Sequence, residues 1–86
     1  MKQYRLYTEN TNIHTIRELV DGYLEGYTIY FTEGRWRGKR EDSLVIEVLS
    51  PVPLDATLEN LAEAIKKASK QAEVWIVETE VKLKVV

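Results

Sequence analysis

Apolar residues recur along this chain at two spacings, and together these spacings predict six elements. Strict alternation over residues 3–8, 43–49 and 73–86, with a run of β-forming residues over 27–32, predicts four strands. In the 43–49 segment both alternating sets contain apolar residues, which favours a strand covered on both faces or a central strand. In the last segment the odd positions from Trp75 to Val85 are apolar except Thr79, and the even positions from Glu78 to Lys84 are charged, so we expect Trp75 to be a buried core residue.

Two further segments show helical spacing. From Ile13 to Leu24 apolar residues recur three or four positions apart, after a polar stretch at 10–12 that can cap a helix. Gly26 suits the position just after that helix. A second helix is expected over about 58–68, capped by Asp55 or Thr57. In it the acidic residues lead and the basic residues follow, as the helix dipole prefers.

The predicted order is therefore β-α-β-β-α-β, an α+β chain. Right-handed crossovers place both helices on one face of a four-stranded antiparallel sheet, which is the ferredoxin-like arrangement. Its spatial strand order is 4-1-3-2, with the first and third strands central. We expect one domain over residues 1–86, because 86 residues leave no room for a second. This fold hosts many unrelated functions and argues none by itself.

The amino-acid composition excludes several kinds of metal-binding and catalytic site. The chain has 86 residues, no cysteine, one histidine and a formal net charge of −2. Without cysteine there are no disulfides, thiolate metal sites or cysteine nucleophiles. His14 has only Glu18 and Thr11 within helical reach, too few ligands for a metal, so we read it as an ordinary surface residue. No phosphate-binding loop, cofactor motif or catalytic set is visible, and we expect no cofactor, metal or catalytic residue.

The cellular location and the oligomeric state of the protein are predicted from its apolar segments and its length. No apolar run approaches the ~20 residues needed to cross a bilayer, and the first residues lack the apolar stretch of a signal peptide. We therefore expect a cytoplasmic protein without a membrane partner. A chain this short has a small core, and its sheet has a second face that carries Tyr7 and other apolar residues. Both features predict a homo-oligomer, most simply a dimer.

The connection between the second and third strands is the most informative segment. It reads as a hairpin with two glycines, with a bulge at Gly34 or Gly38 as an alternative to a regular turn. The hypothetical partner-binding residues there are Arg35, Trp36, Arg37, Lys39 and Arg40. Tryptophan and arginine are the residues that most often anchor protein interfaces. We expect Trp36 to be exposed and available for interaction.

Three interpretations of this hairpin stay open. It can dock on another protein, it can contact a nucleic acid or nucleotide, or it can be a solvated edge kept soluble by its charges. Residues 33–42 hold four bases and three acids, a net charge of only +1, which disfavours non-specific binding to phosphates. The preferred hypothesis is a non-catalytic small binding protein that acts by protein–protein docking. A nucleic-acid or nucleotide binder ranks second, and a small dimeric ferredoxin-like enzyme third.

Three short motifs also carry a resemblance. They are the run Gly26-Tyr27-Thr28-Ile29-Tyr30, the hairpin Gly34-Arg35-Trp36-Arg37-Gly38 and the strand Glu41-Asp42-Ser43-Leu44-Val45-Ile46-Glu47. Together they resemble small uncharacterised proteins of phages and other mobile elements, which carry a G-x-W-x-G hairpin. The resemblance extends to the last strand and implies the same fold and an accessory role. It implies no activity and no site residues.

Overall fold

The computed structural model describes all of residues 1–86 as one sheet with two helices, in the predicted order. The elements are β1 (Lys2–Glu9), α1 (Ile13–Tyr23), β2 (Thr28–Trp36), β3 (Lys39–Ser50), α2 (Asp55–Ser69) and β4 (Trp75–Glu80). All strand pairs are antiparallel and the order across the sheet is β2-β3-β1-β4. The predicted fold class is thus confirmed, including the central positions of β1 and β3.

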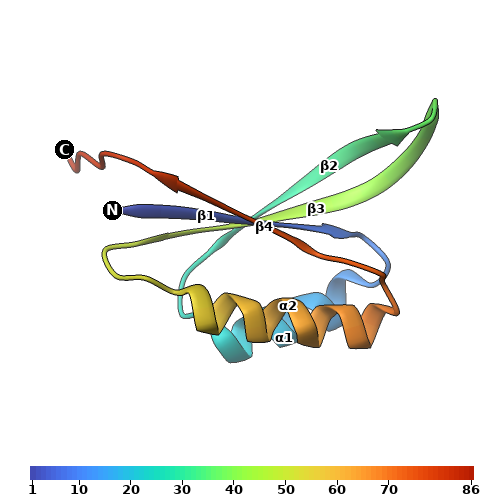
Figure 1. The fold of residues 1–86 in the computed structure, drawn as a ribbon, viewed down its shortest axis with the longest axis horizontal. Coiled ribbons are helices and arrows are strands. Elements are labelled where there is room, and N and C mark those ends of the chain that lie inside the picture. Colours follow the sequence, from blue (N-terminus) through green and yellow to red (C-terminus); the bar gives the residue numbers. More distant parts are fainter.

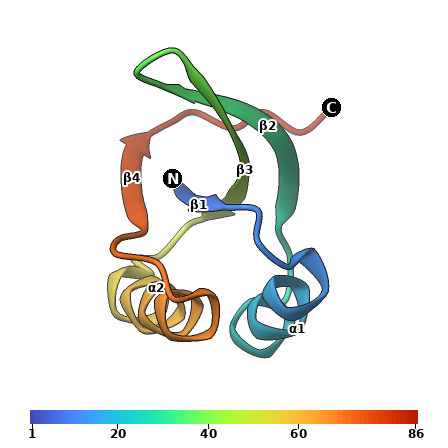
Figure 2. The same ribbon diagram turned by 90° about the vertical axis from the view of Figure 1, so that its right-hand side faces the viewer.

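The sheet and the helices form two layers. Both helices lie side by side under one face of the sheet, with α1 beneath β2 and α2 beneath β4 (Figure 2). The opposite face, here called the open face, has no element covering it. The sheet is strongly twisted, so its two ends rise away from the helices at opposite ends of the molecule (Figure 1).

The core lies between the sheet and the helices. Inward-facing residues of β1 and β3 meet the apolar stripes of both helices, as period-2 and period-3.6 patterns require. The buried cluster consists of Tyr4, Leu6, Ile16, Val20, Leu24, Leu44, Ile46, Val48, Leu58, Leu61, Ala62 and Ile65. Tyr4 is fully buried, yet its hydroxyl accepts the Leu54 backbone N–H at 3.0 Å, so it brings no unpaired polar atom into the core.

The helix boundaries differ in detail from the sequence expectations. The polar stretch 10–12 supplies the cap of α1 as predicted: the side chain of Asn12 accepts the Thr15 N–H at 3.3 Å. The helix ends at Leu24 in an extended conformation, so Gly26 is not the residue after its cap. The prediction that Asp55 or Thr57 caps α2 is also wrong. Asp55 is already helical, and Leu54 precedes the helix without a side-chain capping bond.

The prediction that Trp75 is buried is wrong, and the reason lies in the register of β4. Trp75 pairs with Tyr7, and its side chain is 60% exposed on the open face. The positions that face the helices are the even ones: Ile76 pairs with the buried Leu6, and Val74 packs against the core. An apolar alternating set identifies one face of a strand, but which layer covers that face is decided by the neighbouring strand.

The last strand is also shorter than predicted, since β4 ends at Glu80 and residues 81–86 are in no strand. The β2–β3 hairpin is longer than predicted, because both strands continue to its tip. Regular pairs run through Gly34 and Glu41 to Trp36 and Lys39, so neither glycine marks a bulge. No helix of the structure is long and apolar enough to cross a membrane.

Candidate protein-docking site

The hairpin arm, defined here as residues 33–42, is the outer half of the β2–β3 hairpin and extends beyond the helices (Figure 1). Only two residues, Arg37 and Gly38, connect its strands, and both have positive φ, 50° and 76°. Two such residues form the turn that matches the twist of a hairpin. Glycine adopts this conformation freely, whereas Arg37 adopts it at some cost.

One face of the arm is a self-neutralised charge cluster. Arg35 and Arg40 are cross-strand partners, a like-charge pair that would repel. Glu33 lies 3.7 Å from each of them, and Arg40 Nε donates to Asp42 Oδ1 at 3.0 Å. Arg35 also donates to the backbone carbonyl of Gly38 at 2.9 Å. Two of the five predicted partner-binding residues are therefore engaged within the arm.

The other three predicted residues come together at the tip. Trp36 is 64% exposed and pairs with Lys39 across the hairpin, on the face opposite the charge cluster. The guanidinium of Arg37 lies over the Trp36 ring, 5.4 Å from its centroid. Lys39 forms no ion pair within the chain. The tip thus presents an exposed indole flanked by two cations whose charges the arm does not neutralise.

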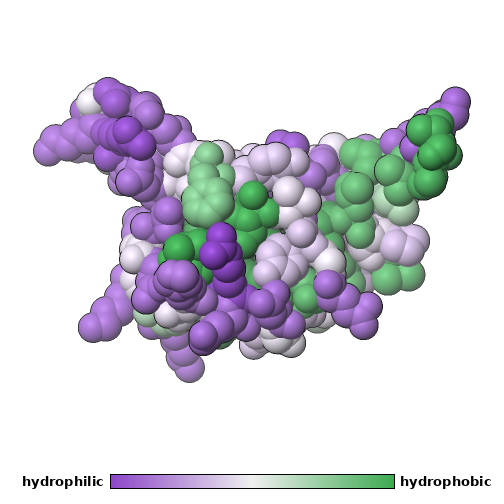
Figure 3. Space-filling view, turned by 180° about the vertical axis from the view of Figure 1, so that it is seen from behind, coloured by the Kyte–Doolittle hydropathy of each residue, from purple (hydrophilic) through white to green (hydrophobic).

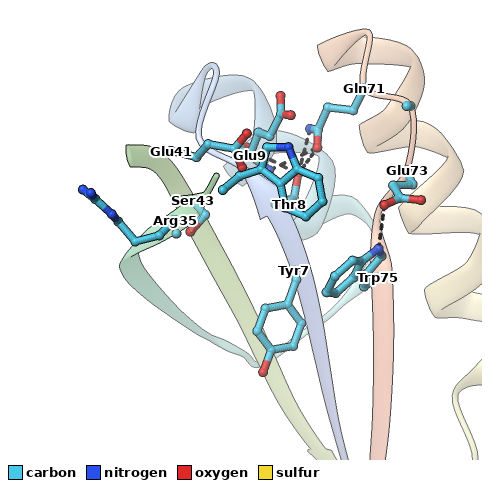
Figure 4. Close-up of a pocket in the computed structure, with 12 residues that line it drawn as sticks. Tyr7, Thr8, Glu9, Arg35, Glu41, Ser43, Gln71, Glu73 and Trp75 are labelled. Carbon is cyan, nitrogen blue, oxygen red and sulfur yellow. Dashed lines mark hydrogen bonds between the residues drawn. The ribbon is translucent and has the colours of Figure 1, made fainter. Parts of the chain in front are cut away.

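A pocket of about 520 Å³ lies where the arm meets the end of β1 and the α2–β4 connection. Its aromatic lining consists of Tyr7, Trp36 and Trp75, the last two of which come from segments far apart in the sequence. In Figure 4 the rings of Tyr7 and Trp75 lie close to each other on neighbouring strands, and Arg35 extends away from them. Sequence reasoning missed this pocket, because only the register of β4 places Trp75 in it.

The charged lining of the pocket is mainly acidic. It includes Glu9, Glu41 and Glu73, of which only Glu73 has a side-chain partner, the Trp75 Nε1–H at 3.0 Å (Figure 4). The one basic residue of the lining, Arg35, is bonded within the arm. Unneutralised carboxylates repel phosphate groups, so this arrangement does not suit a nucleotide phosphate.

The floor of the pocket fixes the α2–β4 connection against β1. Gln71 Nε2 donates to Thr8 Oγ1 at 2.7 Å, and the side-chain oxygen Oε1 of Gln71 accepts the Glu9 backbone N–H at 3.1 Å. Thr8 is buried, so Gln71 supplies the partner that a buried hydroxyl requires. No sequence signal identified this contact, which joins residues 63 positions apart.

A second polar network occupies the centre of the open face. Glu47 is only 14% exposed and accepts from Arg5 Nε at 2.9 Å, from Gln3 Nε2 at 3.1 Å and from the Tyr30 hydroxyl at 3.3 Å. The bond to Glu47 raises the pKa of the Arg5 guanidinium. Apolar side chains surround this network, namely Tyr7, Val45, Leu49, Trp75 and Val77. The open face thus combines exposed apolar area with paired charges, which is typical of protein interfaces.

The comparisons with known proteins support the fold. No protein-family model and no curated protein matches the chain. Among solved structures it is similar to a nitrogen regulatory PII-like protein, CPII from Thiomonas intermedia K12, bound to ADP, AMP and bicarbonate. The identity is 18% and the TM-score 0.62, over 98% of this chain and 94% of that one. It is also similar to a DUF3240 family protein from Shewanella baltica OS155, with 14% identity and a TM-score of 0.70.

That second match covers 99% of this chain and 93% of the other. Identities this low establish a shared ferredoxin-like fold and leave function to be argued from the residues of this chain. Neither match bears on an origin in phages or other mobile elements, which stays a prediction from the sequence.

Proposed function

We propose that this chain is a non-catalytic binding protein that docks on another protein through the tip of the hairpin arm. The observation that carries the proposal is the exposed Trp36 with Arg37 over its ring, held on a regular two-stranded projection. Tryptophan and arginine supply most of the large single-residue contributions at protein interfaces. A short, paired arm also presents them with little conformational entropy to lose on binding.

The charges of the tip indicate the chemistry of the partner. Glu33 and Asp42 neutralise Arg35 and Arg40 on one face, which leaves Arg37 and Lys39 as the free cations beside the indole. The complementary surface has an apolar recess for the indole and acidic groups opposite Arg37 and Lys39. It has no acidic group opposite Glu41, which shares the Trp36 face of the arm. The PII-like match shows that a chain of this fold can serve as a regulatory protein, since that match is named a nitrogen regulatory PII-like protein.

A pull-down from the native host, followed by mass spectrometry, tests the proposal. The full chain and its Trp36→Ala and Arg37→Gln variants serve as baits. We expect specific partners with the wild type and at least a tenfold loss with Trp36→Ala, the size of a hot-spot truncation of about 1.4 kcal/mol or more.

Phe31→Ala is the matched control. Phe31 is also an exposed aromatic of β2 beneath an arginine, with Arg17 6.0 Å from its ring centroid, but it lies outside the arm. It should retain every partner. Equal retention by Trp36→Ala and the wild type would contradict docking through the tip.

A nucleic-acid contact is the alternative that the Arg-Trp combination keeps open, since indole rings stack on bases. The acidic pocket beside the arm and the pairing of Arg35 and Arg40 disfavour it. If all four arm bases contacted phosphates, affinity would fall with a log–log salt slope of about −3 to −4.

Titration with single- and double-stranded oligonucleotides at low and moderate salt separates the two functions. We expect no binding at moderate salt. Micromolar binding that survives there, and that is lost when all four bases are changed to glutamine, would replace the docking proposal.

A further inference from the structure

Residues 81–86, here called the C-terminal tail, carry the sequence pattern of a strand but form none. Val81, Leu83 and Val85 alternate with Lys82 and Lys84, which continues the alternation of β4 without a break. The structure nevertheless ends β4 at Glu80. A pattern that continues past the end of its strand indicates a missing partner rather than a missing propensity.

The hydrogen bonds show where the partner is lost. Residues of β4 pair with β1 as far as Glu80 with Lys2, and the Val81 N–H donates to the Met1 carbonyl at 3.0 Å. No backbone group of residues 82–86 forms a hydrogen bond within the chain. The tail therefore extends beyond the residues of β1 that could continue the ladder.

The tail is also the most exposed apolar segment of the molecule. Leu83 is 53% and Val85 is 85% exposed. Figure 3 shows the contrast directly, because the projection at the C-terminal end is hydrophobic and the one formed by the arm is hydrophilic. An alternating apolar segment with unpaired backbone is suited to joining a sheet edge.

The sheet offers such an edge at β2, the edge strand on the side away from β4. β2 spans nine residues, pairs only with β3 and leaves its outer edge without a partner strand. The outer edge of β4 is the other free edge, and it is six residues long. The charges of the helices favour β2 as the edge that accepts the tail with its two lysines. The segment 13–26 beneath β2 carries one arginine and three acids, whereas residues 55–70 beneath β4 hold three acids and three lysines.

The side chains also match face to face. The odd residues of the tail continue the open-face positions Trp75 and Val77, and its two lysines, at even positions, continue the helix-facing positions. On β2, Tyr30 and Thr32 face the open side. A tail added to β2 would place Leu83 beside these residues and its lysines toward the acidic α1 side.

We propose that the C-terminal tail of one copy adds as a strand to the outer edge of β2 in a second copy. Each copy donates one tail and accepts one, so the assembly closes as a dimer with two exchanged tails or as a ring. This pairing satisfies the unbonded backbone of the tail and protects the exposed edge of β2 in one contact. It does not depend on docking through the arm tip.

The first test is the mass in solution at tens of micromolar, by light scattering. The wild type is expected at a multiple of 10.0 kDa. Leu83→Pro removes a backbone donor and restricts the chain, so it should give a monomer. Leu83→Val keeps strand propensity and apolar character, and should keep the wild-type mass.

Leu83→Pro lies where no backbone bond exists within one chain, so circular dichroism should show an intact fold. A monomeric wild type, or an unchanged mass for a folded Leu83→Pro protein, would overturn the proposal.

The second test uses cross-links, for which the absence of native cysteine gives a clean background. Chains with Leu83→Cys are mixed and oxidised with chains carrying a cysteine at position 30, 32 or 34. These three positions share the open side of β2, so they cover the registers available to Leu83. Lys84→Cys with Thr32→Cys is the control, because those side chains point to opposite faces.

We expect a mixed disulfide between position 83 and at least one β2 position, and none in the control. Cross-linking of Leu83→Cys chains mainly to each other would show pairing between tails instead. That result, or no mixed disulfide at any of the three positions, would contradict the proposal.

Discussion

The hairpin arm and the C-terminal tail project from the sheet at opposite ends of the molecule (Figure 1). They differ in whether their backbone groups have hydrogen-bond partners. The arm is hydrophilic, and its two strands pair with each other up to the turn, so the backbone groups that face across the hairpin are bonded. The tail is apolar and has no backbone partner beyond Val81. Exposure alone therefore does not identify a flexible segment or an interface, because the state of the backbone ladder distinguishes the two projections.

The largest expected difference between the two projections is in amide hydrogen exchange. In dilute solution, the arm amides that bond across the hairpin should exchange about 100-fold or more slowly than those of residues 82–86. At tens of micromolar the tail amides should slow toward the arm values, because pairing with a second copy protects them. Exchange measured by NMR at two concentrations tests this. Tail amides that are protected even when dilute would mean that the two projections do not differ.

The turn of the arm should respond strongly to substitution, whereas the tail has no comparable position. Gly38→Val places a β-branched residue at a φ of +76° and should destabilise the protein by about 1–2 kcal/mol. Arg37→Asn, at a φ of 50°, should be neutral or slightly stabilising, because asparagine tolerates this conformation better. Denaturant unfolding measures both changes. A neutral Gly38→Val would show that the arm is less ordered than its pairing indicates.

The two tryptophans allow a sharper comparison, because sequence reasoning assigned them opposite roles. Both are more than half exposed, so Trp36→Ala and Trp75→Ala should each cost only about 1 kcal/mol or less. A buried tryptophan at position 75 would instead cost about 3–5 kcal/mol. Equilibrium unfolding of both variants decides between these values. A large loss for Trp75→Ala alone would restore the buried role that the register of β4 argues against.

The smallest effect is expected at the base of the tail. Hydrogen bonds from Lys2 and from the N-terminal amino group lower the pKa of Glu80 from its ordinary value of 4.5. The same carboxylate raises the pKa of Lys2. Because the folded-state pKa of Glu80 is depressed, the ionised carboxylate contributes to the stability of the folded state above about pH 4.5. This contribution is lost as the pH falls through the lowered pKa. The residues are exposed, so the effect should be small.

Exchange of the Val81 amide between pH 6 and pH 3 measures this contribution. After correction for the intrinsic pH dependence of exchange, protection should decrease toward pH 3. Glu80→Gln should abolish that decrease. Protection that does not change with pH in the wild type would contradict a role for Glu80 in holding the base of the tail.

Local patterns in the sequence were enough to predict the order of the elements and the topology of the sheet. The helical spacing of Ile16 and Val20, the cap at Asn12 and the alternation of β1 and β3 each depend on neighbouring residues, and the structure confirms them. The partner-binding hypothesis was likewise local, since it rested on one tryptophan among basic residues. The structure divides those residues, leaving Trp36, Arg37 and Lys39 at the tip and pairing the other two.

Contacts between distant segments could not be predicted in the same way. The register of β4 on β1 placed Trp75 on the open face and in the pocket, because an alternating strand has two apolar-compatible faces until a neighbour selects one. Because β1 begins at Lys2, β4 ends at Glu80, although the alternating pattern of β4 continues to Val85. The sequence by itself determined which segments form strands and helices and where cations surround an indole. Only the tertiary structure decided which faces are covered and which edges remain unpaired, because those depend on ladder partners many residues away.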